Sequence, residues 1–594
     1  MQERSCSVLM LSSNLLKSID MNNFKINILA FSMVSLVMVG CSSSFLDTPS
    51  KTTLNSTSFY KNETQINDAI TGCYDGYQYT VSSGAWPSLY QAAESMSTDC
   101  LGGGGPDDRS DRVMNRFDIS INTSATSLFN DLWVDYYKGI YRCNMVLASL
   151  DGVSWSSHTN KIVAECEARA IRGLEYFDLV RMFERVPLLT TPSSSVIPQS
   201  SADSTYMQVV SDLKFCADSM PANQYKGNST YLGRITKYAA EAMLARVYLF
   251  FDGVYDNNAG GTMPGGLTKA QALAYCENVI SSGNYSLETH FKNLWPAACT
   301  TVSATAETKT TTYDEASPEI LWVVKFNDDQ NWSNGYNDGN RFLVNFGIRN
   351  TYSAPYGTGW GACPLTPNAV NQFASGDSRD SATVINCQDI GVYKTQIASD
   401  AMDYTGYVNK KYCPMVYYDG TSIAAAQSST DGITGGNMQT SQYQNWILMR
   451  YSDVLLMAAE LGSSNAIQYF DEVRNRAYGY GDTQSTSNFC DITSTPTQAQ
   501  IWEERRKEFM CEGINYFDLR REGLDNFVAA EIGKAYDNGS ATTGSPIYVY
   551  DNKVKETIAS SFVESNIRTK KGFFQIPYTQ ITLSGNVYTQ NAGW

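Results

Sequence analysis

Six separate segments of this 594-residue chain carry the apolar spacing of amphipathic helices, and this feature constrains the fold most strongly. The segments are 161–183, 236–251, 268–281, 451–461, 464–478 and 497–511. In each, apolar side chains recur every three or four residues, which places them on one face of an α-helix. Gly462 and Ser463 alone separate two of the segments, so we predict an antiparallel helical hairpin there. Small alanine contacts favour tetratricopeptide-like packing, although no regular consensus repeat is present. We therefore predict a mainly α-helical scaffold of helical hairpins.

A long stretch without helical spacing, residues 295–436, interrupts the predicted helices. It is dominated by Asn, Gly, Ser, Thr and Tyr and contains Trp322, Trp332 and Trp360. A segment of this length without secondary structure is uncommon in a compact domain unless it carries function. We interpret it as a large loop-rich insertion that bears a recognition surface.

The N-terminal residues predict export and anchoring. An apolar run at 26–40 follows a lysine and ends at Cys41, and three serines come next. The run is shorter than the ~20 apolar residues that cross a bilayer, and it has the length of a signal-peptide core. It resembles a bacterial lipoprotein box, with Met38 where leucine is usual, which implies that Cys41 is lipidated and becomes the first mature residue. The alternative is an ordinary secretory signal with an incidental cysteine. Met21 is a second candidate for the start of the chain.

Composition argues against two classes of partner and one kind of site. The net charge of -16 and the pI near 4.7 disfavour nucleic acid and anionic lipid surfaces, which need clustered Lys and Arg. The fourteen cysteines are scattered and form no CxxC pair, so we expect no zinc site. We interpret Cys166, Cys216, Cys276 and Cys511 as small core residues within helical segments.

The sequence lacks the parts of common catalytic and cofactor sites. Only His158 and His290 are present, each isolated in a polar stretch, so we expect neither a nucleophilic triad nor a histidine metal site. The glycines at 102–105 lack the lysine and following helix of a phosphate-binding loop, and we interpret them as a flexible loop. The oxygen-rich segment 327–338 lacks the spacing of a calcium loop, so its sequence gives calcium little support. We expect no catalytic residue, no cofactor and no metal.

A row of charged residues near the C-terminus has two interpretations. The row comprises Glu504, Arg505, Glu508 and Glu512, which we expect to pair along a helix and with Arg520 or Arg521. Charges three or four residues apart are typical of a helix face that is solvated or bridged by ion pairs. The alternative is a pair of catalytic carboxylates, as glycosidases use. We favour the structural interpretation.

Motifs along most of the chain match those of one family. Phe45, Leu46, Asp47 and Pro49 closely follow Cys41. Further matches are Phe59, Tyr60, Asn62, Gly72 and Tyr74, and residues within 133–144, 165–187, 233–240, 450–460, 473–477, 504–520, 576–577 and 590–593. This set resembles the SusD/RagB family of outer-membrane lipoproteins over residues 45–594. Two departures, at 170–173 and 183–185, replace residues that are usual in the family, and neither lies on the expected binding surface.

The resemblance implies a SusD-like α/α superhelix with a lipid anchor. We divide the chain into a lipoprotein signal peptide (1–40), a lipidated tether (41–55), an N-terminal SusD-like region (56–230) and a SusD/RagB region (231–594) that holds the insertion and the C-terminal helices at 450–530. The family implies a non-enzymatic protein at the surface of the outer membrane that captures oligosaccharides or polysaccharides for a SusC-like TonB-dependent transporter. The alternatives are a peptide or glycopeptide ligand and, third, a surface glycoside hydrolase.

Aromatic residues of the loop-rich regions are the expected ligand contacts. Sugar rings stack their C–H faces on Trp and Tyr, and their hydroxyls bind groups such as Asn and Arg. The chain has 38 Tyr and 10 Trp, many of them in stretches with no helical face to bury them. The candidates for stacking are Trp86, Tyr90, Trp332, Tyr336, Tyr352, Tyr356 and Trp360, and those for hydrogen bonding are Arg109, Asn334, Asn337 and Arg341. The alternative for any one aromatic is that it covers the helical core.

Overall fold

Helices packed in sequence order form the main layer of the structure. The computed structural model describes residues 59–83, 86–105, 109–225, 229–302, 309–310, 312–327, 330–331, 336–392, 403–415, 417–418, 423–424, 439, 442–479, 491–533 and 560–594. Those from Tyr60 onward belong to one unit. The predicted signal peptide and tether, with Cys41, lie outside the described residues.

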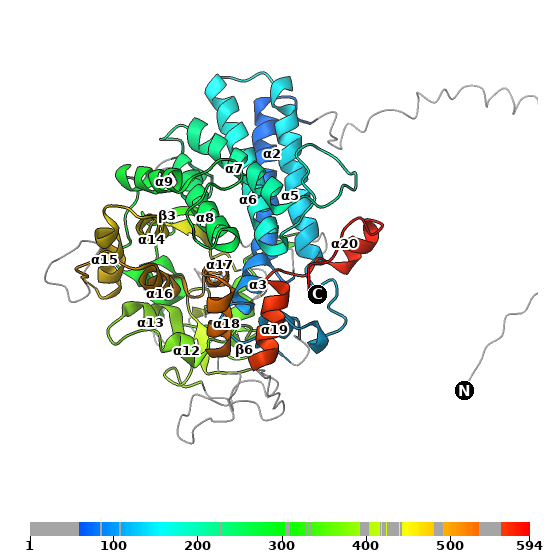
Figure 1. The fold of residues 1–594 in the computed structure, drawn as a ribbon. Helices are drawn as coiled ribbons and strands as arrows, with labels where there is room; N and C mark the ends of the chain where they lie inside the picture. Colours follow the sequence, from blue (N-terminus) through cyan, green and yellow to red (C-terminus); the bar gives the residue numbers. More distant parts are fainter. Residues whose placement is uncertain are drawn as a thin grey trace, which may run out of the picture. The chain divides into compact units, whose positions relative to one another are not determined.

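The helical array runs from the first described helix to the C-terminal region (Figure 1). Its members are α2 (Glu63–Gln78), α5 (Asn130–Ser149), α6 (His158–Phe183), α7 (Ala202–Ser219), α8 (Lys237–Tyr255), α9 (Lys269–Ser281), α14 (Tyr451–Leu461) and α15 (Ala466–Ala477). Each helix from α5 to α9 packs on the next, α9 packs on α14, and α14 packs on α15. The mainly α-helical fold of tetratricopeptide-like hairpins is thereby confirmed.

Capping residues explain where the predicted helices begin and end. The side chains of Thr236, Thr268 and Thr497 each accept a hydrogen bond from a backbone N–H in the first turn, so the helix starts one residue after each threonine. Gly462 ends α14 with a left-handed φ of 93°, a conformation that favours glycine. The predicted hairpin between α14 and α15 is therefore present, with the second helix starting two residues later than expected.

The other longer helices pack the C-terminal part of the chain onto the N-terminal part. They are α3 (Leu89–Ser95), α4 (Arg109–Arg116), α16 (Gln498–Phe509), α17 (Asn515–Arg521), α18 (Leu524–Gly533), α19 (Ser560–Lys570) and α20 (Tyr578–Leu583). Helix α17 contacts both α3 and α8, and α16 contacts α14. In the described part of the chain, none of the helices combines the length and apolar content that crossing a bilayer requires.

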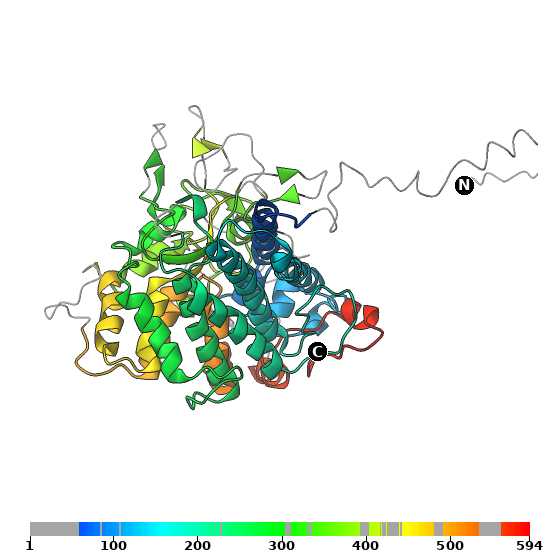
Figure 2. The same ribbon diagram turned by 90° about the horizontal axis from the view of Figure 1, so that it is seen from above.

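The predicted insertion contains only short elements where the structure describes it. Its short helices are α10 (Pro296–Cys299), α11 (Phe342–Phe346), α12 (Pro367–Val370) and α13 (Ser378–Thr383). Its antiparallel pairs are β1 (Thr301–Val302) with β2 (Lys309–Thr310), β4 (Gln330–Asn331) with β5 (Tyr336–Asn337), β8 (Val384–Asn386) with β9 (Tyr407–Asn409), and β10 (Tyr417–Tyr418) with β11 (Ile423–Ala424). Strands β6 (Ile348–Arg349) and β7 (Thr358–Gly359) pair in parallel. Figure 2 shows green and yellow-green strands along one side of the helical layer.

One longer strand pair connects the insertion to the helices. Strand β3 (Ile320–Val324) pairs antiparallel with β12 (Trp446–Arg450), which leads directly into α14. All five residues of β12 are buried. The two strands therefore place the beginning and the end of the irregular region side by side.

The described cysteines are core thiols. All of them are free, and all except Cys299 are buried. Cys166, Cys216 and Cys276 lie within α6, α7 and α9, as predicted. Cys511 is buried but follows the end of α16 with a φ of 68°, so its predicted helical position is wrong.

A buried ion network joins the helices to the irregular region. Glu508 of α16 forms ion pairs with Arg379, Arg450 and Arg476, which come from α13, β12 and α15. Glu319 bridges Arg450 and Arg476, with N–O distances of 2.8 and 2.7 Å. All five side chains are almost fully buried. Because a buried charge is tolerated only when it is paired, these residues hold five parts of the chain together as one set.

The network keeps Glu508 ionised in spite of its burial. Burial alone would raise the pKa of this carboxyl, but Arg476, Arg450 and Arg379 outweigh that effect and hold the pKa of Glu508 well below its usual range. The folded pKa is lower than the unfolded one, so the stabilisation is present above the ordinary glutamate pKa. It is lost only as the pH falls towards the much lower folded value.

The charged row at 504–512 is bridged but not solvated. Glu504 pairs with Arg379, and Glu512 pairs with Lys411 at 2.6 Å, so the bridges run to other elements rather than along the helix. These carboxylates are buried and committed to cations. The solvated interpretation is wrong. Bridging by ion pairs is confirmed, but the expected partners are wrong, because Arg521 pairs with Glu460 and Asp518 instead. A glycosidase pair gains no support, because such carboxyl groups must face substrate.

Replacing Glu508 by glutamine should lower the free energy of unfolding by about 3–5 kcal/mol, because three buried arginines lose their shared charge. Guanidinium or thermal unfolding of the mature chain measures the loss. The matched control is Glu503→Gln on the same helix, whose side chain is 65% exposed and pairs with Lys507. Its change should stay below about 1 kcal/mol. Equal losses in the two variants would contradict the role given to the network.

Candidate ligand-binding site

Three predicted site residues that are distant in sequence, Trp86, Arg341 and Trp360, meet in the structure. The two indole rings pack edge to face, with centroids 5.6 Å apart and planes at 73°. The Arg341 guanidinium carbon lies 6.0 Å from the Trp86 ring centroid and 5.6 Å from that of Trp360. All three residues are partly exposed. We call this group the tryptophan–arginine cluster. Its geometry combines aromatic pairing with cation–π attraction and still leaves surface open to a ligand.

Two short helices bring Trp86 and Arg341 together. Trp86 lies shortly before α3, and Arg341 is the residue that precedes α11. Asn345 of α11 donates a buried hydrogen bond of 3.1 Å to the side-chain oxygen of Gln91 in α3. Leaving buried amides without partners costs about 1–3 kcal/mol each, so this bond favours one arrangement of the two helices.

Backbone hydrogen bonds hold Trp360 beside α11. Its N–H donates to the Val344 carbonyl at 2.7 Å. Its carbonyl accepts a hydrogen bond from the Arg349 Nη1 atom at 2.9 Å. Strand β7 ends one residue before Trp360 and pairs with β6. The indole therefore projects from backbone that is fixed on both sides.

The glycine run at 102–105 also hydrogen-bonds to the segment that follows Trp360. The Gly104 N–H donates to the Gly361 carbonyl at 2.8 Å, and the Cys363 N–H donates to the Gly102 carbonyl at 3.0 Å. Gly103 has a φ of 73°, and a Cβ atom there would lie 2.5 Å from the Gly361 carbonyl oxygen. The expectation of a flexible loop is wrong, because these glycines are buried and paired in an approach that excludes side chains.

Arg341 contributes a positive charge with no carboxylate partner among the described residues. Its Nε atom is buried and makes no hydrogen bond within the described part of the chain. Burial lowers the pKa of Arg341, yet a guanidinium remains charged at physiological pH. The cluster therefore places an uncompensated cation next to two aromatic rings.

Two predicted stacking residues, Tyr90 and Tyr356, are buried instead. Tyr90 is 4% exposed, and its ring stacks on Trp446 with centroids 4.5 Å apart. Tyr356 is 8% exposed in a small apolar cluster, with the Lys410 Nζ atom 5.5 Å from its ring centroid. Burial raises the pKa of Tyr356 to about 12. The exposed placement expected for both is wrong, because irregular segments also fold back onto a core.

Of the remaining predicted ligand-binding residues, the structure describes the side chain of one. Tyr352 is exposed. Tyr336 and Asn337 form β5 and Arg109 begins α4, but their side chains are outside the description. Outside the described residues altogether are Trp332 and Asn334. A ligand-binding role for any of these residues stays a prediction. The contributions of Arg349, Gln91 and Asn345 were not predicted, since nothing local in the sequence distinguishes them.

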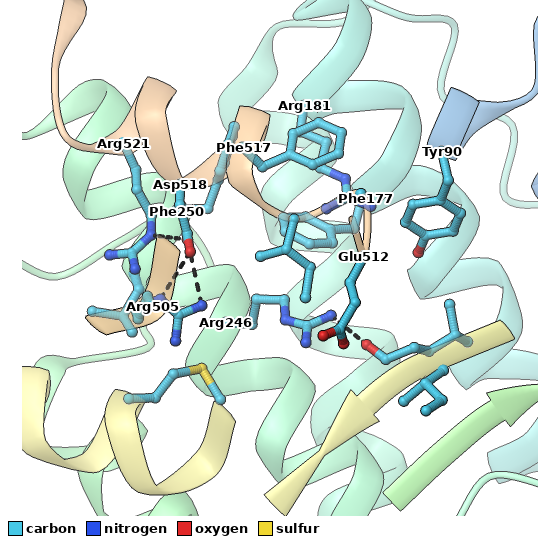
Figure 3. A pocket seen from close by; sticks show the side chains of 16 residues that line it. Tyr90, Phe177, Arg181, Arg246, Phe250, Arg505, Glu512, Phe517, Asp518 and Arg521 are labelled. Carbon is cyan, nitrogen blue, oxygen red and sulfur yellow. Dashed lines mark hydrogen bonds and ion pairs between the residues drawn. The ribbon is translucent and has the colours of Figure 1, made fainter. Parts of the chain in front are cut away.

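An enclosed cavity in the core is too small for a ligand. Its volume of about 20 Å³ suits roughly one water molecule. Figure 3 shows aromatic and charged side chains around it, among them Tyr90, Phe177, Phe250, Arg181, Arg246 and Glu512. Two of its other arginines, Arg505 and Arg521, both pair with Asp518. We interpret this cavity as part of the packing between the helices.

A larger pocket of about 470 Å³ is lined by residues of α2, α6 and β3. Three charged residues at its edge pair with residues that do not line it. These pairs are Asp75 with Arg142, Arg234 with Glu167, and Lys325 with Glu315. Trp322 in its wall is buried, and its Nε1 donates to the Gly233 carbonyl at 3.0 Å. The pocket thus lacks the combination of open indole surface and uncompensated charge that marks the cluster.

Two family models match this chain. A model described as starch-binding associating with outer membrane matches residues 44–249, and a model of the SusD family matches residues 318–594. The chain belongs to the SusD family. Trp86 lies in the first matched region of this SusD-family chain, and Arg341 and Trp360 lie in the second.

Relatives and solved structures agree with this membership. The SusD-like protein P2 of Formosa agariphila is 25% identical over 86% of this chain and 93% of its own length. Surface glycan-binding protein A from Bacteroides fluxus has a TM-score of 0.68 at 19% identity, over 90% of this chain and all of that one. The corresponding protein from Bacteroides thetaiotaomicron, in complex with laminarihexaose, has a TM-score of 0.64 at 21% identity, over 89% and 100% of the two chains. These structures share the fold of this SusD-family chain.

Replacing Gly103 by alanine should destabilise the protein by about 2–4 kcal/mol, because the new Cβ adds a steric clash to the strain of a positive φ. Unfolding experiments on the mature chain measure this. The control is Gly391→Ala, which has the same φ of 73° but no atom within 4 Å of the added carbon. The control should lose only about 1 kcal/mol. Matching losses would contradict the close approach to Gly361.

Proposed function

We propose that this SusD-family chain is a non-enzymatic, cell-surface lipoprotein that captures a glycan and delivers it to a SusC-like TonB-dependent outer-membrane transporter. The observation that carries the proposal is the tryptophan–arginine cluster. Partly exposed indole rings beside a hydrogen-bond donor match a sugar, which has an apolar C–H face and polar hydroxyls. A fold neighbour in complex with laminarihexaose supports carbohydrate as the ligand class.

The chemistry of the cluster favours binding over cleavage. Most glycoside hydrolases need two carboxyl groups that flank the bond to be broken. The defining side chains of the cluster are two indoles and one guanidinium. These groups stack on a sugar and donate hydrogen bonds to it, but they neither protonate a leaving oxygen nor activate water. The proposed role is therefore capture without hydrolysis.

The proposed anchor is Cys41, lipidated after removal of the signal peptide. The apolar run that ends at this cysteine and the family description of outer-membrane association support it. Residues 42–55 then serve as the tether between the lipid and the folded unit. Several acyl chains on one terminus hold a domain on a membrane far more firmly than a single chain does.

Replacing Trp360 by alanine should weaken glycan binding about tenfold or more, because anchoring aromatics carry much of the binding free energy. Affinity gels with a polysaccharide panel identify a ligand, and calorimetry with an oligosaccharide of it measures the loss. The control is Tyr578→Ala, which removes a ring that is 60% exposed on α20. Its affinity should match that of the wild type.

Two results would count against the proposed site and role. Normal affinity in both Trp86→Ala and Trp360→Ala would show that the ligand binds elsewhere. New reducing ends, released from polysaccharide by the purified wild-type protein, would show that the protein is an enzyme.

Replacing Cys41 by alanine should move the protein from the membrane fraction to the soluble fraction, because the proposed lipidation position then has no thiol to carry the acyl chains. Fractionation and labelling with a radioactive fatty acid measure the change. Cys6→Ser, upstream of the proposed cleavage site, is the control and should leave labelling intact. Membrane retention of the Cys41 variant without label would contradict lipid anchoring.

A further inference from the structure

Arg341 differs from the buried arginines of the ion network in lacking an acid partner among the described residues. Arg379, Arg450 and Arg476 each pair with at least one carboxylate. Arg341 instead faces two indole rings, whose centroids lie 6.0 and 5.6 Å from its guanidinium carbon. Partly burying a cation without a counter-ion costs free energy. Proteins keep such local costs mainly at functional sites.

A second guanidinium group, that of Arg349, lies beside Trp360. The Arg349 guanidinium lies 2.9 Å from the Trp360 carbonyl. The acid nearest to Arg341 along the chain, Asp338, is buried, and its carboxylate accepts a hydrogen bond of 3.1 Å from Asn327. Two guanidinium groups therefore flank Trp360, one at its ring and one at its backbone.

The negative net charge of the whole chain does not oppose a local anion site. At physiological salt, exposed charges farther apart than about 8 Å are largely screened from each other. The charge of -16 is spread over the whole chain, whereas Arg341 lies within 6.0 Å of both indole rings. A ligand group in contact with the cluster therefore experiences the charge of Arg341 most strongly.

We infer that the glycan is acidic, an inference that rests on the proposed function. Arg341 binds a sulfate or carboxylate group on the glycan, and the sugar stacks on Trp86 and Trp360. A guanidinium donates two parallel hydrogen bonds to either anion. Neutral hydroxyls also accept hydrogen bonds from Arg341, but they leave its charge uncompensated. An anion satisfies the donors and compensates the charge together.

The test compares laminarin with chemically sulfated laminarin, which shares its backbone, and adds polygalacturonate as a carboxylate probe. Calorimetry on the mature chain is run at about 50 mM and about 500 mM salt. At low salt, at least one acidic probe should bind about tenfold or more tightly than laminarin, and the difference should shrink at high salt. The two acidic probes distinguish sulfate from carboxylate.

Variants then assign the preference to Arg341. Arg341→Gln should remove the preference for the acidic probe over laminarin, whereas Arg341→Lys should keep part of the preference. Arg568→Gln removes an exposed arginine paired with Glu564 and should behave as the wild type. Thermal unfolding confirms that each variant is folded. The comparison of laminarin with the acidic probes on the wild-type protein needs no variant. It therefore tests the preference for an acidic ligand even if Arg341→Gln does not fold.

The inference and the proposed function fail in different ways. If laminarin binds as tightly as both acidic probes, or if Arg341→Gln weakens neutral and acidic binding equally, the acidic ligand is wrong and glycan capture stands. The same holds if the acidic preference survives in Arg341→Gln, because another residue then supplies it. If no glycan in the full panel binds, both the inference and the proposed function are overturned.

Discussion

The buried ion network around Glu508 is the constraint on which the arrangement of the molecule depends. Its members come from α13, α15, α16, β12 and the residue before β3, so it joins the helical array to the loop-rich region. An apolar contact of similar size would tolerate small shifts of these elements. Buried charges tolerate them less, because a displaced partner leaves an unpaired ion in a medium that solvates it poorly.

The tryptophan–arginine cluster, our proposed binding site, is connected to this network through a short series of packed rings. Arg450 ends β12, and Trp446 begins the same strand. The Trp446 ring stacks on Tyr90 with centroids 4.5 Å apart and meets Phe342 edge to face at 4.3 Å. Tyr90 lies in α3 close to Trp86, and Phe342 follows Arg341 directly. Tyr90 is thus a positioning residue for the cluster, although its sequence context suggested a ligand contact.

The parts that sequence predicted well are those governed by local rules. Helical spacing identified α6, α8, α9, α14, α15 and α16 with bounds within four residues of those observed, because a helix satisfies its hydrogen bonds within its own segment. Trp86, Arg341 and Trp360 have the side chains expected of a sugar site. Their meeting could not be predicted, since it depends on Asn345 bonding to Gln91 and on the glycines at 102–104 approaching Gly361. Such contacts leave no periodic signal, and the same lack of periodicity made Tyr356 look exposed.

The way in which the cluster is held bears on how it can discriminate among ligands. The Trp360 backbone is hydrogen-bonded to Val344 and Arg349. The helix that begins after Arg341 is joined to α3 by the hydrogen bond from Asn345 to Gln91. A site whose parts are already fixed loses little conformational freedom when a ligand binds, so more of the contact free energy appears as affinity. Two indole faces accept many sugars alike, because all sugar rings have apolar C–H faces. Discrimination among sugars then depends on a charged group that forms directional hydrogen bonds. Among the described residues of the cluster that group is Arg341.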